Sequence, residues 1–204
     1  MYAHYNARNA GKRKSEMNFG WKKYKNLIDK GTEQRRKWCG PGEKLDVLSI
    51  IEFELPLQVF GFKWDIVADS EWDGTPDEEA FVRFVKAGRK IYPTLTVRET
   101  VWVGASKSDV SARFTLAHEL AHIFLHQRLA NVRLSREAHT PTSSRTNSKQ
   151  EREANVYAGA LLIDIPSITK ETTFFDLRSQ YDVSHDVARH ALEQVEYVRK
   201  GRGF

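Results

Sequence analysis

The residues of this chain best suited to chemistry are two histidines, His118 and His122, with Glu119 directly after the first. They form the pattern His-Glu-x-x-His. On a helix, side chains four residues apart lie on one face, one turn apart, so both imidazoles can reach a single metal ion. The glutamate lies where it can take a proton from a metal-bound water. This arrangement predicts a metal-dependent hydrolase.

The residues around this motif predict the helix that must carry it. The stretch 112–126 contains no glycine or proline. Apolar residues recur at helical spacing on the side away from the motif, namely Leu116, Leu120, Ile123 and Phe124. We therefore expect a helix with one face toward a core and the other toward the metal. Ser106 and Asp109 form a Ser-x-x-Asp pattern typical of its start.

A catalytic zinc site needs three protein ligands and one open position, so a third ligand must come from elsewhere. Glu151 is our candidate, on a second helix predicted from Lys149 to about Leu162. Asn155, one turn later, would hydrogen-bond a ligand histidine and fix its ring. Glu153 points about 200° away from Glu151, so it is only a reserve ligand. The alternative for Glu151 is a solvated carboxylate in the first turn of that helix.

His126 continues the histidine stripe by one more turn. Metzincins instead have a glycine between and place the third histidine where this chain has Arg128. We therefore interpret His126 as a helix-end or supporting residue and not as a ligand. A donor for the oxyanion is also needed, and polarity alone offers three candidates without deciding among them: His139, Arg145 and Tyr157.

Two blocks of the chain resemble the ImmA/IrrE family of metallopeptidases. They are Ala112-Arg113-Phe114-Thr115-Leu116-Ala117-His118-Glu119-Leu120-Ala121-His122 with Leu125-His126, and Glu151-x-x-Ala154-Asn155-x-Tyr157-Ala158-x-x-Leu161-Leu162. Weaker similarity extends from about Asp46 to Leu192. The exit from the second helix, Leu161 to Pro166, is two residues longer than the family usually has.

The resemblance implies a site and a substrate. His118, His122 and Glu151 would hold Zn²⁺, or alternatively Mn²⁺, and Glu119 would be the catalytic base. Members of the family are known for cleaving or inactivating helix-turn-helix repressors. The resemblance therefore implies a protein partner that is a DNA-binding repressor.

Composition limits the class of protein. The 204 residues, 40% of them hydrophobic, suit one domain with extensions. No run of eighteen apolar residues and no signal-peptide core is present, so we expect no membrane span. The single cysteine, Cys39, excludes an internal disulfide framework and fits a reducing compartment. We therefore expect a cytoplasmic protein.

Positive charge is concentrated in residues 1–44. They hold twelve lysines and arginines against four acidic residues, a net of +8, whereas the rest holds twenty against twenty-three, a net of −3. Between Asn18 and Trp38, four apolar residues recur at helical spacing among lysines: Trp21, Tyr24, Leu27 and Ile28. We favour a helix docked on the core. The alternatives are contact with an acidic partner or with nucleic acid phosphates.

The remaining pattern predicts an α+β, zincin-like fold, in which a small antiparallel sheet packs on the motif helix and the second ligand-bearing helix. The expected elements are a helix at 45–60, strands at 62–68, 81–86, 91–97 and 100–103, and a hairpin turn at 87–90. The last strand would leave an edge near His118. Such an edge could pair with an extended peptide.

We expect three parts: a basic, partly helical extension at 1–44, a metallopeptidase core at 45–170 and a helical pair at 171–204 packed on that core. The pair resembles a helix-turn-helix in outline, with Ser184 as N-cap of its second helix. Glu193 and Glu196 lie on that second helix and would repel phosphate. We therefore expect packing or partner recognition there, and not DNA readout.

The leading hypothesis is a zinc endopeptidase acting on a protein partner. The alternative is a regulatory binding module with a structural or vestigial metal site, which sequesters a repressor or binds nucleic acid through residues 1–44. A metallohydrolase of a non-peptide bond ranks last, because the chain has no phosphate-cradling glycine loop.

Overall fold

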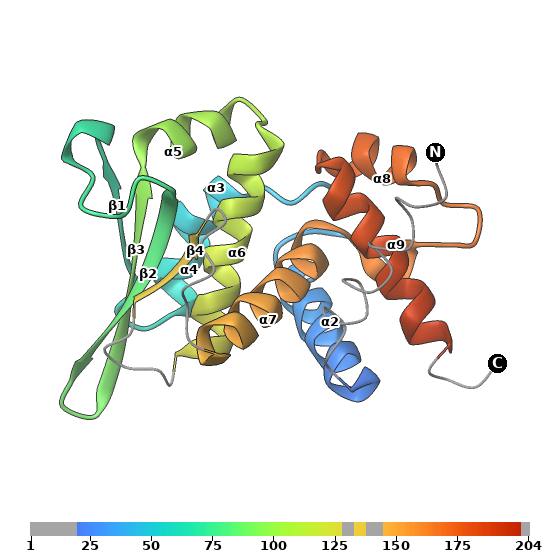
Figure 1. Cartoon of the computed structure of the whole chain (residues 1–204), viewed down its shortest axis with the longest axis horizontal. Helices are drawn as coiled ribbons and strands as arrows, with labels where there is room; N and C mark the ends of the chain where they lie inside the picture. Colours follow the sequence, from blue (N-terminus) through green and yellow to red (C-terminus); the bar gives the residue numbers. More distant parts are fainter. Residues whose placement is uncertain (1–19, 128–132, 138–144, 201–204) are drawn as a thin grey trace, which may run out of the picture.

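The computed structural model describes residues 20–127, 133–137 and 145–200. It confirms the α+β class, with a twisted sheet on one side and helices on the other (Figure 1). The four strands lie in the order β1-β3-β2-β4 and comprise β1 Lys63–Val67, β2 Glu78–Ala87, β3 Lys90–Arg98 and β4 Arg133–Glu137. Within the described residues, no helix is both long and apolar enough to cross a membrane.

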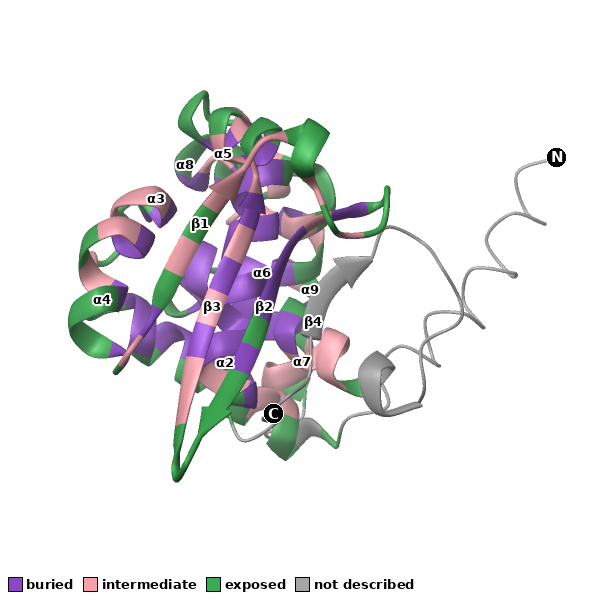
Figure 2. Ribbon diagram, turned by 90° about the vertical axis from the view of Figure 1, so that its left-hand side faces the viewer, coloured by how far each residue is buried: buried purple, intermediate pink, exposed green. Residues whose placement is uncertain are grey.

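The predicted hairpin turn joins β2 to β3, which pair antiparallel from Ala87↔Lys90 to Ala80↔Val97. Gly88 takes a φ of 62°, a left-handed conformation that glycine adopts without steric cost. The sheet is mixed and not wholly antiparallel, because β1 runs parallel to β3. Along β3, buried and half-buried residues alternate, and Figure 2 shows this alternation with α6 behind the sheet.

The strand expected at 100–103 is wrong, because this segment belongs to helix α5, Glu99–Ser106. Its β-branched residues suggested a strand, but Val101 and Ala105, one helical turn apart, are both buried. Trp102 stacks on Trp64 of β1, with ring centroids 5.0 Å apart. The peptide-binding edge expected there is therefore absent, and the outer strands are β1 and β4.

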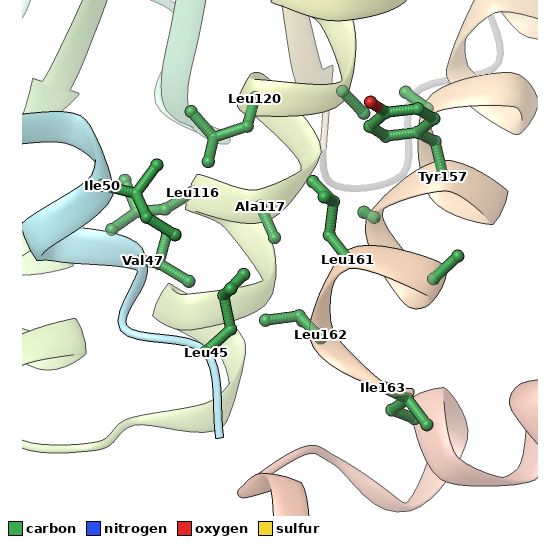
Figure 3. Packing of buried hydrophobic residues seen from close by; sticks show 14 of the residues in the cluster. Leu45, Val47, Ile50, Leu116, Ala117, Leu120, Tyr157, Leu161, Leu162 and Ile163 are labelled. Atoms are coloured by element: carbon green, nitrogen blue, oxygen red, sulfur yellow. The ribbon is translucent and has the colours of Figure 1, made fainter. Parts of the chain in front are cut away.

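The motif helix is α6, Val110–His126, and the second predicted helix is α7, Arg145–Leu162. Asp109 caps α6, since its carboxylate accepts hydrogen bonds from the backbone N–H groups of Ser111 and Ala112. Ser106, the other half of the expected capping pattern, ends α5 instead. The predicted core face is present: Leu116 and Leu120 are buried and point from α6 toward Ile50, on the side away from α7 (Figure 3).

The predicted helix at 45–60 forms three consecutive turns: α3 Val47–Ser49, a π-helical turn Ile50–Glu54 and α4 Leu55–Gln58. Pro56 lies in the first turn of α4 and has no N–H to donate to the turn before it. The N–H of Leu55 bonds to the carbonyl of Ile50, a widened turn that accommodates this loss. Short 3₁₀ turns, Asp69–Glu71 and Ile165–Ser167, complete the connections.

The basic segment near the N-terminus forms α2, Trp21–Arg35, and it is docked on the core as expected. Leu27 and Ile28 are buried in the main hydrophobic cluster. Gly31 lies where a Cβ would approach Ala160 of α7 to 2.8 Å, so the two helices touch almost backbone to backbone. Arg35 is 1% exposed and donates hydrogen bonds to the carbonyl oxygens of Leu161 and Leu162, at the end of α7.

The C-terminal pair comprises α8, Phe174–Tyr181, and α9, His185–Lys200. Ser184 caps α9 as predicted, accepting a hydrogen bond from the N–H of Val187 at 3.3 Å. Buried Arg113 of α6 donates to the carbonyl oxygens of Tyr181 and Asp182 at 3.0 and 2.6 Å. One hydrophobic cluster runs from α2 to α9, while the division of the chain at 44 and 170 stays a prediction.

Candidate metal centre

The two helices α6 and α7 bring three donor groups to one point. Nε2 of His118 lies 2.9 Å from Oε2 of Glu151, and Nε2 of His122 lies 3.4 Å from Oε1 of the same carboxylate. The two Nε2 atoms are 3.0 Å apart. Both histidines are at most 1% exposed, while the Glu151 side chain is 27% exposed. The structure therefore brings together the three residues that the sequence suggested as ligands.

The separations of these donors fit a metal ion. In a tetrahedral zinc site with nitrogen and oxygen ligands at about 2.0–2.1 Å, two donor atoms lie about 3.3 Å apart. The observed separations of 2.9, 3.0 and 3.4 Å bracket that value. Each residue also belongs to a ligand type that zinc and manganese accept. The three side chains could hold one ion after small adjustments.

Glu119 completes the cluster. His118, Glu119 and His122 each offer a donor atom, and these atoms lie within 4.8 Å of one another. All three residues are buried, Glu119 completely. A carboxylate beside two imidazoles in a buried site is placed to exchange a proton with a bound reactant and not to meet bulk solvent.

A second layer of hydrogen bonds orients both imidazoles. Nδ1 of His118 lies 2.9 Å from Oδ1 of Asn155, one turn beyond Glu151 on α7. Nδ1 of His122 lies 2.9 Å from Nδ1 of His126. Nε2 of His126 lies 3.2 Å from Oε2 of Glu153. The Nε2 atoms of His118 and His122 are thereby left to face each other and Glu151.

A family model, the IrrE N-terminal-like domain named Peptidase_M78, matches residues 78–193. The chain belongs to the Peptidase_M78 family. The matched range begins at the first residue of β2 and ends within α9, so it includes all the site residues described so far. A search of curated proteins found no match to the chain. The family supports metal-dependent peptidase activity and a protein substrate.

In this Peptidase_M78 site, the pKa values of Glu151 and His122 favour the protonation states in which these side chains can bind a metal. Burial alone would raise the pKa of Glu151, but hydrogen bonds from His118 and His122 outweigh it and hold the pKa at about 2. Burial lowers the pKa of His122 below its ordinary 6.5, and the neighbouring His118 lowers it further. At neutral pH, Glu151 is therefore ionised and His122 is neutral, as metal binding requires.

The reserve ligand, Glu153, lies elsewhere. Its carboxylate contacts His126 and the ammonium group of Lys23, on the side of α7 turned toward α2. This agrees with the expected angular separation from Glu151. Lys23 was not anticipated from the sequence, where nothing distinguishes it from the other lysines near the N-terminus.

Of the three oxyanion candidates, the structure describes the side chain of Tyr157 alone, and it is not brought to the metal centre. Tyr157 stacks on Phe124, with ring centroids 6.2 Å apart, and lines a cavity with Lys30 and Glu33 of α2. It points away from the donor groups because it lies six residues beyond Glu151 on α7. His139 lies outside the described residues, as does the side chain of Arg145.

Proposed function

We propose that this Peptidase_M78 protein is a zinc endopeptidase in which His118, His122 and Glu151 hold the ion and Glu119 is the catalytic base. The observation that carries the proposal is the convergence of three donor atoms, from two helices, at separations of 2.9 to 3.4 Å. Two independent hydrogen bonds, from Nδ1 of His118 to Asn155 and from Nδ1 of His122 to His126, hold the imidazole rings in this orientation.

The chain's own residues then carry the proton transfers. When bound, zinc would polarise the scissile carbonyl and make water a better nucleophile near neutral pH. Glu119 takes a proton from the attacking water and passes it to the leaving amine. Its complete burial beside the two imidazoles supports this role, because the carboxylate is shielded from bulk solvent at the place where a reactant would bind.

The finer identity of the substrate rests on the family resemblance. We propose a helix-turn-helix repressor as the protein that is cleaved, and the cytoplasm as the compartment, since Cys39 has no second cysteine to pair with in the chain. Outer strands β1 and β4 each have one edge without a neighbouring strand of the described sheet. Either edge offers backbone groups with which an extended peptide could pair.

The test starts with metal content, measured by elemental mass spectrometry on the wild-type chain and on Glu151→Ala. About one zinc per wild-type chain and a weakened complex in the variant are expected. Glu119→Gln should retain the zinc yet lose cleavage of candidate helix-turn-helix repressors, by at least about 100-fold if proton transfer is lost. A wild-type chain that stays folded without metal when zinc is supplied would refute the proposal. So would full cleavage by Glu119→Gln.

A binding module remains the second candidate, because α2 and the residue after it keep exposed basic side chains, among them Lys22, Lys30 and Arg36. Deleting residues 1–44 would not test it cleanly, since the deletion also removes buried Leu27 and Ile28 from the core. Replacing exposed lysines by glutamate leaves that packing intact. A steep salt dependence of partner or nucleic acid binding, abolished by this charge reversal, would favour the module.

A further inference from the structure

A chain of polar contacts leads from the candidate metal ligand His122 to the N-terminal helix. Nδ1 of His122 lies 2.9 Å from Nδ1 of His126, and Nε2 of His126 lies 3.2 Å from Oε2 of Glu153. The other carboxylate oxygen of Glu153 forms an ion pair with Nζ of Lys23 in α2. His126 is 6% exposed, the Glu153 side chain 14% and the Lys23 side chain 43%. The contacts thus run from the buried site to the surface.

The chemistry of imidazole assigns a direction to these hydrogen bonds. If Nε2 of His122 faces a metal, the proton of the neutral ring must be on Nδ1, which then donates. Nδ1 of His126 must accept that bond, so His126 carries its own proton on Nε2 and donates it to Glu153. A carboxylate is the acceptor that best stabilises this arrangement, and Lys23 holds the carboxylate in place.

The close packing of α2 on α7 holds Lys23 next to Glu153. Gly31 allows α2 to approach the backbone of α7 closely, and buried Arg35 binds the last carbonyl groups of α7. Glu153 lies on α7, two residues after Glu151. The helix that carries one candidate ligand is therefore tied to α2 at both its site-bearing turn and its C-terminal end.

We propose that Lys23 is a positioning residue for the metal centre, acting on His122 through Glu153 and His126. The inference rests on the proposed metal ligands and goes further, because α2 lies outside the range that the family model matches. The N-terminal helix is thus part of the metal-binding machinery of this protein. Its role is to fix the orientation and tautomer of His122.

The test measures zinc affinity of the full-length chain by competition with a coloured chelator. Disturbing partners behind a ligand histidine typically weakens metal binding about 10- to 100-fold. We expect Glu153→Gln to fall in this range and Lys23→Ala near its lower end, with Lys23→Arg close to wild type. The matched control is Lys25→Ala, which removes the same charge from the same helix but, among the described residues, breaks an ion pair with Asp29 and none with Glu153. It should bind zinc like the wild type.

A double variant tests whether Lys23 acts through Glu153. If it does, Lys23→Ala adds no further loss of affinity once Glu153→Gln is present. The visible absorption spectrum of the Co²⁺-loaded protein gives a second readout, because it reports the ligand geometry around the ion. We expect Lys23→Ala and Glu153→Gln to shift this spectrum in the same direction and Lys25→Ala to leave it unchanged.

The outcomes separate this inference from the function on which it rests. A wild-type chain that binds no zinc would overturn both. A wild-type chain that binds zinc, with equal affinities for Lys23→Ala and Lys25→Ala, would overturn the positioning role alone. Additive losses in the double variant would also overturn it, since Lys23 would then act by another route.

Discussion

The sharpest test of how α2 supports the core is the substitution Arg35→Met. Arg35 is 1% exposed, and its guanidinium donates to Leu161 O at 2.8 Å and to Leu162 O at 3.2 Å. A third bond goes to the carbonyl of Glu43. The first two acceptors lie at the C-terminal end of α7, where carbonyl groups lack partners within the helix and carry its negative dipole. Methionine would fill much of the volume without donating any of the three bonds.

The expected loss follows from these contacts. Leaving a buried carbonyl without a donor costs about 1–3 kcal/mol, and bonds from a charged donor are at the upper end. Methionine also removes a buried charge, whose desolvation destabilises the fold, and this gain offsets part of the loss. Glu43 is exposed, so water can replace the third bond, and for the two buried carbonyls we expect a net fall of about 3 kcal/mol in the free energy of unfolding.

The assay is urea denaturation followed by far-UV circular dichroism, with Arg36→Met as control. Arg36 is the next residue and is exposed, so its replacement should change stability by less than about 0.5 kcal/mol. The m-values should agree between the two variants. A loss under about 1 kcal/mol for Arg35→Met would refute the reasoning, because the carbonyl groups would then have found other donors.

Three further substitutions test the packing around the core and the charge pairing of Asp182. A Cβ at Gly31 would lie 2.8 Å from the Cβ of Ala160 in α7, so Gly31→Ala should lower the free energy of unfolding by about 2 kcal/mol. At Gly159 the nearest atom that a Cβ would meet is 3.8 Å away, so Gly159→Ala should raise the free energy of unfolding by about 0.5–1 kcal/mol. Both values can be measured by the same urea denaturation. Burial opposes ionisation of Asp182, but Lys44 and Arg113 outweigh it and hold its pKa below the ordinary 3.8. A lowered folded-state pKa stabilises the fold fully above the unfolded-state value, and this stabilisation is lost as the pH falls through the folded-state value, so Asp182→Asn should lose about 1 kcal/mol at pH 7. The difference from wild type should vanish as the pH falls below about 4, and a constant difference would contradict the charge pairing.

Local patterns account for what could be predicted. The motif helix follows from apolar residues at a spacing of three and four, but its start does not follow from the expected capping box, because Asp109 is the N-cap and Ser106 ends α5. The β2–β3 hairpin follows from alternation on both sides of Gly88-Arg89. Periods of 3.6 and 2 depend on neighbours within a few residues, so they can be read without knowing the fold. The same periodicity placed Glu151 and Asn155 on one face.

Local patterns did not predict the elements whose structure depends on contacts with residues distant in the sequence. Thr100 to Val103 reads as a strand, yet the stacking of Trp102 on Trp64 and the burial of Val101 favour a helix. The parallel pairing of β1 with β3, and β4 at the edge beside β2, follow no local rule either. Propensity amounts to a few tenths of a kcal/mol per residue, and burial of a large side chain exceeds it.

The sequence by itself determined which side chains could do chemistry, because the donor atoms of histidine and glutamate and their spacing on a helix belong to the local chain. Only the tertiary structure decided which of them meet. Glu151 faces His118 and His122, Glu153 faces His126, and α2 supplies Lys23 from the far end of the sequence. These contacts depend on how α2, α6 and α7 pack against one another, and that packing is set by the shape and burial of many residues at once.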